Sequence, residues 1–86
     1  IALLGCKGLD TANGVSDSSE GEANLKAEMS SHAARVVVLA DHSKFDQTAF
    51  VTFLDWDTVD CIITDKKPDG RWVEFCSRKN IRLIYE

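Results

Sequence analysis

The sequence predicts an α/β fold with a three-layer, mostly parallel, Rossmann-like sheet. Short apolar runs typical of buried strands alternate with segments of helical periodicity, and the connections between them are short. Polar or glycine-rich turns directly follow three of these runs. Because parallel strands end at the same edge of a sheet, these turns predict a ligand crevice there.

The 86 residues suffice for one small domain, and 44% hydrophobic with 28% charged residues is a globular composition. The net charge of −4 argues against direct contact with nucleic acid. Cys6, Cys61 and Cys76 are far apart in the sequence and have no histidine cluster near them, so we expect neither a metal site nor a disulfide framework. Reduced thiols and the lack of a membrane-length apolar run indicate a cytoplasmic protein without a membrane partner.

Both ends of the chain are apolar, whereas domain termini are usually polar. We therefore expect a piece of a larger domain, namely the C-terminal half. An apolar strand edge at Ile1–Leu4 invites pairing with another chain, so a homo-oligomer is expected through that edge or through Trp56.

Ile1–Leu4 is the first predicted strand, and a glycine-rich loop follows over residues 5–14. Ser19 and Glu22 fit a capping box, which predicts a helix over residues 20–34. The expected inner stripe of this helix is Leu25, Met29 and Ala33. Glu22 and Lys26 are expected to pair on its outer face.

The strand over residues 36–40 is the clearest element, and its β-branched run predicts cover on both faces. Residues 45–60 fit either a strand or a helical turn. Another strand is predicted over residues 61–64, followed by a turn-rich loop over residues 65–70. A helix over residues 71–79, with Trp72, Phe75 and Cys76 facing inward, and a strand over residues 81–85 complete the chain.

Two of the three turns carry candidate ligand-binding groups. Gly5, Gly8 and Asp10 offer close backbone approach and one carboxylate, although an ordinary tight turn is the more frequent reason for such glycines. In the turn over residues 41–44, Lys44 could bind a carboxylate, phosphate or hydroxyl, and Asp41 could take a sugar hydroxyl or orient Lys44. The alternative is a cap formed by Asp41 and Ser43, with Lys44 in solvent.

Several segments occur in an order that resembles the C-terminal sensor domain of DeoR-type transcriptional repressors. They are Leu3–Asp10, Gly14–Ser16, Glu22–Met29, Val38–Phe45 and Val59–Asp65. The Leu-Ala-Asp-His-Ser-Lys-Phe and Ile-Thr-Asp runs are the most specific, and the resemblance covers nearly the whole chain.

The resemblance implies a sensor related in fold to ribose-phosphate isomerase, glucosamine-phosphate deaminase and CoA transferases. It implies that the sensor binds a phosphorylated sugar or related metabolite, without a cofactor or metal. This binding is expected to change the affinity of a winged-helix module for operator DNA. The residues implied at the sugar site are Gly5, Lys7, Gly8, Asp10, Asp41 and Lys44.

Residues 1–86 are expected to be a partial sensor, because a winged helix and the first half of such a sensor have no counterpart here. Asp46 stands where glycine is common in the family, and Ser16 replaces a common threonine. Two alternatives stay open. One is an isomerase-like or deaminase-like enzyme with Asp10, Glu20 or Glu22 as base. The other is an interaction piece that uses the sheet edge and Trp56.

Overall fold

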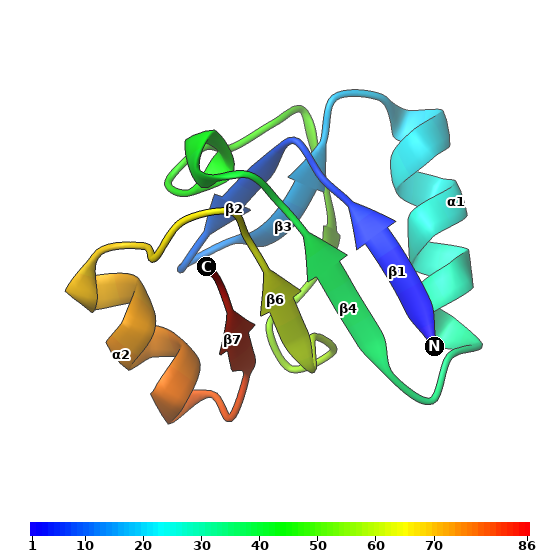
Figure 1. Ribbon diagram of the computed structural model, residues 1–86. Helices are drawn as coiled ribbons and strands as arrows, with labels where there is room; N and C mark the ends of the chain where they lie inside the picture. The colour runs from blue at the N-terminus through cyan, green and yellow to red at the C-terminus, as the bar shows by residue number, and fades with distance from the viewer.

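The computed structural model describes all 86 residues and confirms the α/β class with a mostly parallel sheet (Figure 1). This sheet contains four strands in the order β1 (Ala2–Gly5), β4 (Val36–Leu39), β6 (Cys61–Ile63) and β7 (Arg82–Ile84), and every neighbouring pair is parallel. Gly5 lies beside Leu39, and Leu39 beside Ile63, so the carboxyl ends of the strands share one edge.

A second, antiparallel sheet contains β2 (Gly8–Asp10), β3 (Gly14–Asp17) and β5 (Val51–Leu54). The prediction of an open loop over residues 5–14 is therefore wrong in part, because residues 8–17 form a hairpin. Leu9 and Val15 are completely buried and hold this hairpin in the core. Gly14 turns the chain at φ 107°, a conformation that L side chains rarely adopt.

Helix α1 (Glu20–Ser31) begins where predicted, and the Ser19 side chain accepts a hydrogen bond from the Glu22 backbone N–H. It ends three residues earlier than expected, and the predicted inner stripe is wrong. Leu25 and Met29 are exposed, whereas Ala23 and Ser30 are buried, and α1 contacts β3 and β5. Small residues allow α1 to lie close to β3 and β5.

Helix α2 (Gly70–Arg78) confirms its prediction, because its buried residues are Trp72, Phe75 and Cys76. Asp69 caps its start by accepting a hydrogen bond from the Trp72 N–H. A short 3-10 turn, η1 (His42–Lys44), follows β4. Neither α-helix is long and apolar enough to cross a membrane.

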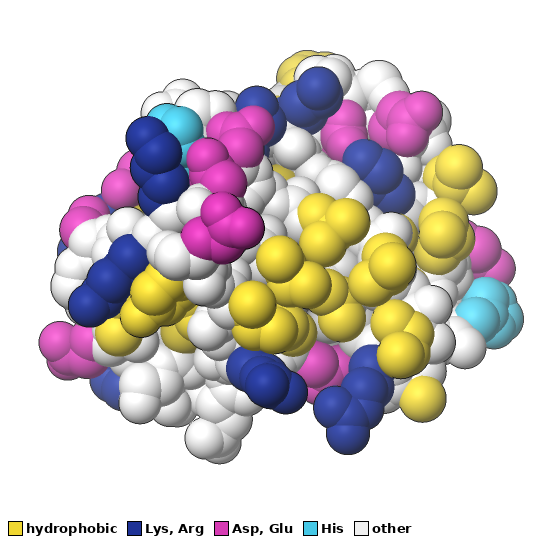
Figure 2. Space-filling view, viewed as in Figure 1, with side chains coloured by type: hydrophobic (Ala, Val, Ile, Leu, Met, Phe, Trp, Pro, Cys, Tyr) yellow, Lys and Arg dark blue, Asp and Glu magenta, His cyan; other side chains and the backbone are white.

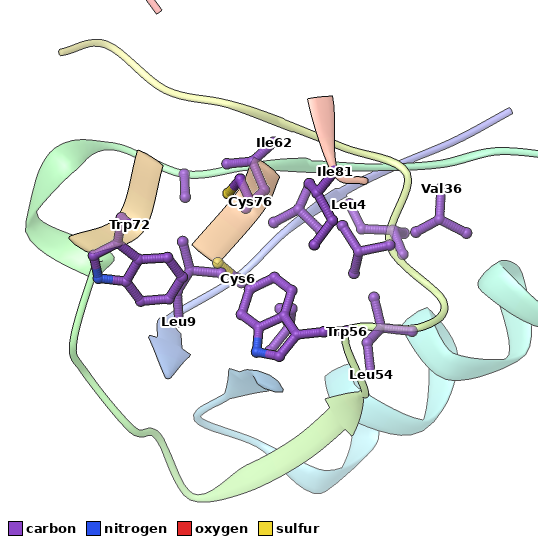
Figure 3. Packing of buried hydrophobic residues seen from close by; sticks show 14 of the residues in the cluster. Leu4, Cys6, Leu9, Val36, Leu54, Trp56, Ile62, Trp72, Cys76 and Ile81 are labelled. Carbon is purple, nitrogen blue, oxygen red and sulfur yellow. The ribbon is translucent and has the colours of Figure 1, made fainter. Parts of the chain in front are cut away.

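The core lies on one side of the parallel sheet, between that sheet and a layer made of the antiparallel sheet and the helices (Figure 3). Trp56 and Trp72 meet edge to face with ring centroids 5.8 Å apart. Trp56 is only 6% exposed, and its indole N–H donates to the Asp10 carbonyl. The expectation that Trp56 serves as an interface residue is therefore wrong.

The other face of the parallel sheet is bare. Val36 and Val38 point into the core, but Leu39 is exposed, so the prediction that this strand is covered on both faces is wrong. Figure 2 shows apolar side chains gathered over the middle of this face. The chain thus supplies two of the three layers that the fold class implies.

Candidate functional site

Three turns that follow parallel strands meet at one edge of the sheet, as predicted. The turn after β4 joins the turn after β6, because the His42 ring and backbone N–H both bond to the Asp65 carboxylate at 2.8 and 2.7 Å. The β1 turn joins the β4 turn through a bridge between Leu9 and Phe45. The Asp46 N–H also donates to the Leu9 carbonyl at 2.8 Å.

The Asp41–Lys44 turn forms the predicted cap, and Asp41 also pairs with Lys44. Asp41 caps η1 by accepting hydrogen bonds from the backbone N–H and hydroxyl of Ser43, and these bonds lower its pKa. The Lys44 ammonium lies 3.5 Å from the Asp41 carboxylate. The Lys44 side chain is only 28% exposed. Packing therefore restricts its position more than it restricts a fully solvated lysine on a turn.

Lys26 of α1 reaches the end of β1 from the opposite side. Its ammonium donates to the Asp17 carboxylate at 2.6 Å and to the Gly5 carbonyl at 3.0 Å. The predicted outer pair of Lys26 with Glu22 is therefore wrong. Burial alone would raise the pKa of Asp17, but the Lys26 ammonium and the Ser18 N–H outweigh it and lower that pKa.

Cys6 directly follows β1 and is buried. Burial raises the pKa of its thiol to about 11, while the Gly8 backbone and the charges of Lys26 and Lys44 act in the opposite direction. The Lys26 ammonium is at the end of β1, where it bonds to the Gly5 carbonyl. The Lys26 ammonium is held by two protein oxygens, whereas Lys44 has only the Asp41 carboxylate and a 3.5 Å contact to the Ser43 hydroxyl.

The predicted residues of the β1 turn differ in their surroundings. A Cβ on Gly5 would meet no other atom within 4 Å. A Cβ on Gly8 would collide with the Gln47 carbonyl, so Gly8 allows the two backbone segments to lie close together. Lys7 is exposed, and its side chain makes no hydrogen bond. Asp10 is used by the hairpin itself, because its carboxylate accepts bonds from the Ala12 N–H, the Asn13 N–H and side chain, and the Thr48 hydroxyl.

A shallow hollow of about 540 Å³ opens at the same edge, next to the Asp41 turn. Asp41, Asp65 and Glu86 supply carboxylates to its wall, and Thr64 and Tyr85 supply hydroxyl groups. Carboxylate and hydroxyl groups suit a polyhydroxylated ligand. Lys44 does not line this hollow itself, but its ion-pair partner Asp41 does.

Sequence reasoning placed Asp65 and Asp17 in turns at this edge but did not single them out as functional residues. Asp65 follows an apolar strand directly, in the same way as Asp41, and that position was the available signal. Asp17 gave no such signal, because its role depends on Lys26, nine residues later, reaching back across the start of α1.

Comparison with known proteins identifies the family of this chain. The DeoR C terminal sensor domain family matches residues 1–66. The HTH-type transcriptional regulator IolR of Bacillus subtilis (strain 168) is 30% identical over 95% of this chain and 33% of its own length. For the HTH-type transcriptional repressor GlcR of the same organism the figures are 30%, 96% and 32%. A putative aga operon transcriptional repressor of Escherichia coli O157:H7 is 36% identical over 98% of this chain and 31% of its own length.

The chain spans about a third of the length of these curated relatives. The matched family region contains β1 to β6, and so includes the first two turns at the carboxyl edge and the start of the third, Asp65 and Lys66. The chain belongs to the DeoR C-terminal sensor domain family.

Proposed function

We propose that this chain is the effector-binding part of a cytoplasmic transcriptional repressor of sugar catabolism, and that its effector is a phosphorylated sugar or related metabolite. The observation that carries the proposal is the meeting of the three turns at one sheet edge, with the Lys44 ammonium beside them. Ligands of open α/β sheets bind outside the carboxyl ends of the strands.

The chemistry of the edge supports this class of ligand. An ammonium group binds a phosphate oxygen as a compact point charge, and Lys44 has few competing protein partners. The Asp41 and Asp65 carboxylates can accept hydrogen bonds from sugar hydroxyls. Of the residues first expected here, Gly5, Lys7, Asp41 and Lys44 remain in the proposed site. Gly8 and Asp10 support it from the hairpin.

In this proposal the sensor acts on DNA through another part of the parent protein. Residues 1–86 are then part of the sensor, and a winged-helix module elsewhere in the parent binds the operator. The acidic charge of this chain, −4, supports that division of roles. The parent is proposed to be a homo-oligomer, since β1 has a free, apolar edge.

A regulatory role fits the site better than catalysis does. Both Asp10 carboxylate oxygens are held by the hairpin, and Glu20 and Glu22 are exposed in the first turn of α1. The hydrogen bonds that occupy the Asp10 carboxylate count against its use as a general base.

Replacement of Lys44 tests the proposal in the full-length parent. Lys44→Ala removes a charge-assisted hydrogen bond worth about 1.5–3 kcal/mol, so the affinity for the effector should fall roughly tenfold or more. Isothermal titration with candidate sugar phosphates measures this affinity. Lys79→Ala, which replaces an exposed lysine at the C-cap of α2, is the control and should bind normally. Equal affinities of the two variants would reduce Lys44 to a structural turn residue.

A further inference from the structure

His42 binds the Asp65 carboxylate through two separate donors. Its backbone N–H donates to one carboxylate oxygen at 2.7 Å, and its ring Nδ1 lies 2.8 Å from the other oxygen. Because an ionised carboxylate only accepts hydrogen bonds, Nδ1 carries the proton of this contact. The ring bond is the main reason why the pKa of Asp65 falls to about 2, so the carboxylate is charged at neutral pH. One residue thus fixes both oxygens of Asp65.

This contact lies outside the core, where it contributes little to the stability of the fold. The His42 and Asp65 side chains are 54% and 46% exposed, and neither residue belongs to the hydrophobic core. Water competes for the partners of an exposed ion pair and weakens their attraction. The contact therefore matters more for where its groups are held than for whether the chain folds.

The two bonds hold the start of η1 to the turn after β6. His42 is the first residue of η1, and Lys44 is the last. The side chains of Asp41, Ser43 and Lys44 bond only within their own turn. His42 is therefore the residue through which this turn is joined to its neighbour.

The end of η1 is held differently, by the core. The Phe45 ring packs edge to face on Trp72, with ring centroids 4.9 Å apart. The Asp46 N–H donates to the Leu9 carbonyl. Loss of the contact between the two turns would thus release the start of η1 and leave its end in place.

Asp65 keeps one acceptor position for a ligand. A carboxylate offers about four lone-pair positions. His42 uses one on each oxygen, and the Thr64 hydroxyl lies 3.3 Å from the oxygen that accepts the His42 N–H. The free position is therefore on the oxygen that accepts the ring bond. Because Asp65 lines the hollow at the carboxyl edge, this position suits one hydroxyl group of a ligand.

We propose that His42 is a positioning residue of the effector site and acts on the effector through Asp65. It fixes the Asp65 carboxylate for one hydroxyl of the effector and holds the start of the turn that carries Lys44. An acceptor that is fixed before binding loses less conformational freedom when the ligand arrives. This inference rests on the proposed function, which assigns Asp65 and Lys44 to the same ligand. His42 itself does not line the hollow, so its effect is indirect.

Two substitutions of His42 separate positioning from other effects. Asparagine places an amide N–H near the position of Nδ1 and can restore the bond to Asp65. Glutamine has a longer side chain, places its amide near the position of Nε2, and loses that bond. Because the contact is half exposed, both variants should keep the melting temperature of the unsubstituted parent.

Hydrogen exchange followed by mass spectrometry tests the positioning without a ligand. In the full-length parent, the peptide with residues 41–46 should exchange about threefold to tenfold faster in His42→Gln than in the unsubstituted protein. In His42→Asn its exchange should return to the unsubstituted rate. The peptide with residues 72–78 of α2 is the control and should not change. Equal exchange of the turn in all three proteins would overturn the proposal, because the ring would then not hold the turn.

Isothermal titration of the same three proteins tests the consequence for binding. The probes are the monophosphates of glucose, fructose and galactose. For the tightest of them, His42→Gln should lower the affinity about tenfold, because a charge-assisted contact at the site is no longer fixed. His42→Asn should restore the affinity.

The remaining outcomes distinguish this inference from the proposed function. Unchanged affinity in His42→Gln would overturn the positioning role and leave the proposed function standing. Equal losses in both variants would assign the ring its own bond to the ligand and would also overturn the positioning role. If no probe binds the unsubstituted parent, the proposed function fails for these ligands, and the exchange rates alone decide on His42.

Discussion

At the scale of single residues, the pair of Lys26 and Asp17 is the most deeply buried charge interaction of the chain. Their side chains are 19% and 3% exposed, and the pair joins α1 to β3 while the Gly5 carbonyl takes a further bond. The pair therefore fixes the turn after β1, which carries part of the proposed site.

Replacing Lys26 should destabilise the protein strongly. Lys26→Met leaves the Asp17 carboxylate buried without its cation, which costs about 3 kcal/mol of the free energy of unfolding. Urea denaturation measures this loss. Glu22→Gln, one turn earlier and exposed, is the control and should stay within about 0.5 kcal/mol. If Lys26→Met is as stable as that control, the pair does not hold the turn.

Asp46 is a residue whose backbone and side chain have opposing effects on stability. It adopts a φ of 63°, which is unfavourable for most side chains. Its carboxylate accepts hydrogen bonds from the Arg71 guanidinium and from the Trp72 indole N–H, and so ties the turn to α2.

Two substitutions of Asp46 separate these effects. Asp46→Ala loses both hydrogen bonds and keeps the unfavourable φ, whereas Asp46→Gly loses the same bonds but accepts that φ freely. The alanine variant should therefore be less stable than the glycine variant by about 1 kcal/mol. Thermal unfolding followed by circular dichroism measures the difference. Equal stability of the two variants would show that the backbone conformation contributes nothing.

At the scale of elements, the His42–Asp65 contact joins the turns after β4 and β6 side by side. The hydrogen bond from His42 lowers the pKa of Asp65 from 3.8 to about 2. Because the folded pKa is the lower one, the carboxylate stabilises the folded state above about pH 4. That contribution is lost as the pH falls toward 2.

Carboxyl carbon chemical shifts test this contact. In a titration by nuclear magnetic resonance, Asp65 should have its midpoint near 2. His42→Gln should move the midpoint back toward 3.8, the usual value, because the ring bond is lost. A midpoint near 3.8 in the unsubstituted protein would mean that the two turns are not joined in solution.

Sequence periodicity predicts an element well where large residues face the core. Helix α2 is such a case, with Trp72, Phe75 and Cys76 at helical spacing. Helix α1 was misjudged because its inner residues are small and its large residues, Leu25 and Met29, face solvent. The β2–β3 hairpin was missed because glycine and turn residues dominate it, and only its partner β5 makes it a sheet.

The sequence predicts only those parts of the candidate site that directly follow a recognisable strand. The turn at Asp41–Lys44 was found because it follows the clearest strand. The structural use of Asp10 was not predictable, since it depends on Thr48, far along the chain. Contacts between side chains distant in sequence leave no local pattern.

At the scale of the whole molecule, the net charge of −4 should keep this chain from binding operator DNA by itself. Affinity for DNA comes largely from basic groups on phosphates, and an acidic surface opposes it. Mobility-shift measurements at low salt should detect no sequence-specific complex at micromolar concentration. The full-length parent serves as the positive control. A specific complex of the 86-residue chain would assign DNA contact to this domain.

The aromatic cluster gives the molecule an optical signal of its own. The Trp56 and Trp72 rings lie close enough, with an interplanar angle of 70°, for their electronic transitions to couple. The Trp72 indole is bonded to Asp46, two residues after Lys44, so movement of that turn alters the surroundings of the ring. Near-ultraviolet circular dichroism and tryptophan emission can therefore report binding of the proposed effector without an attached dye.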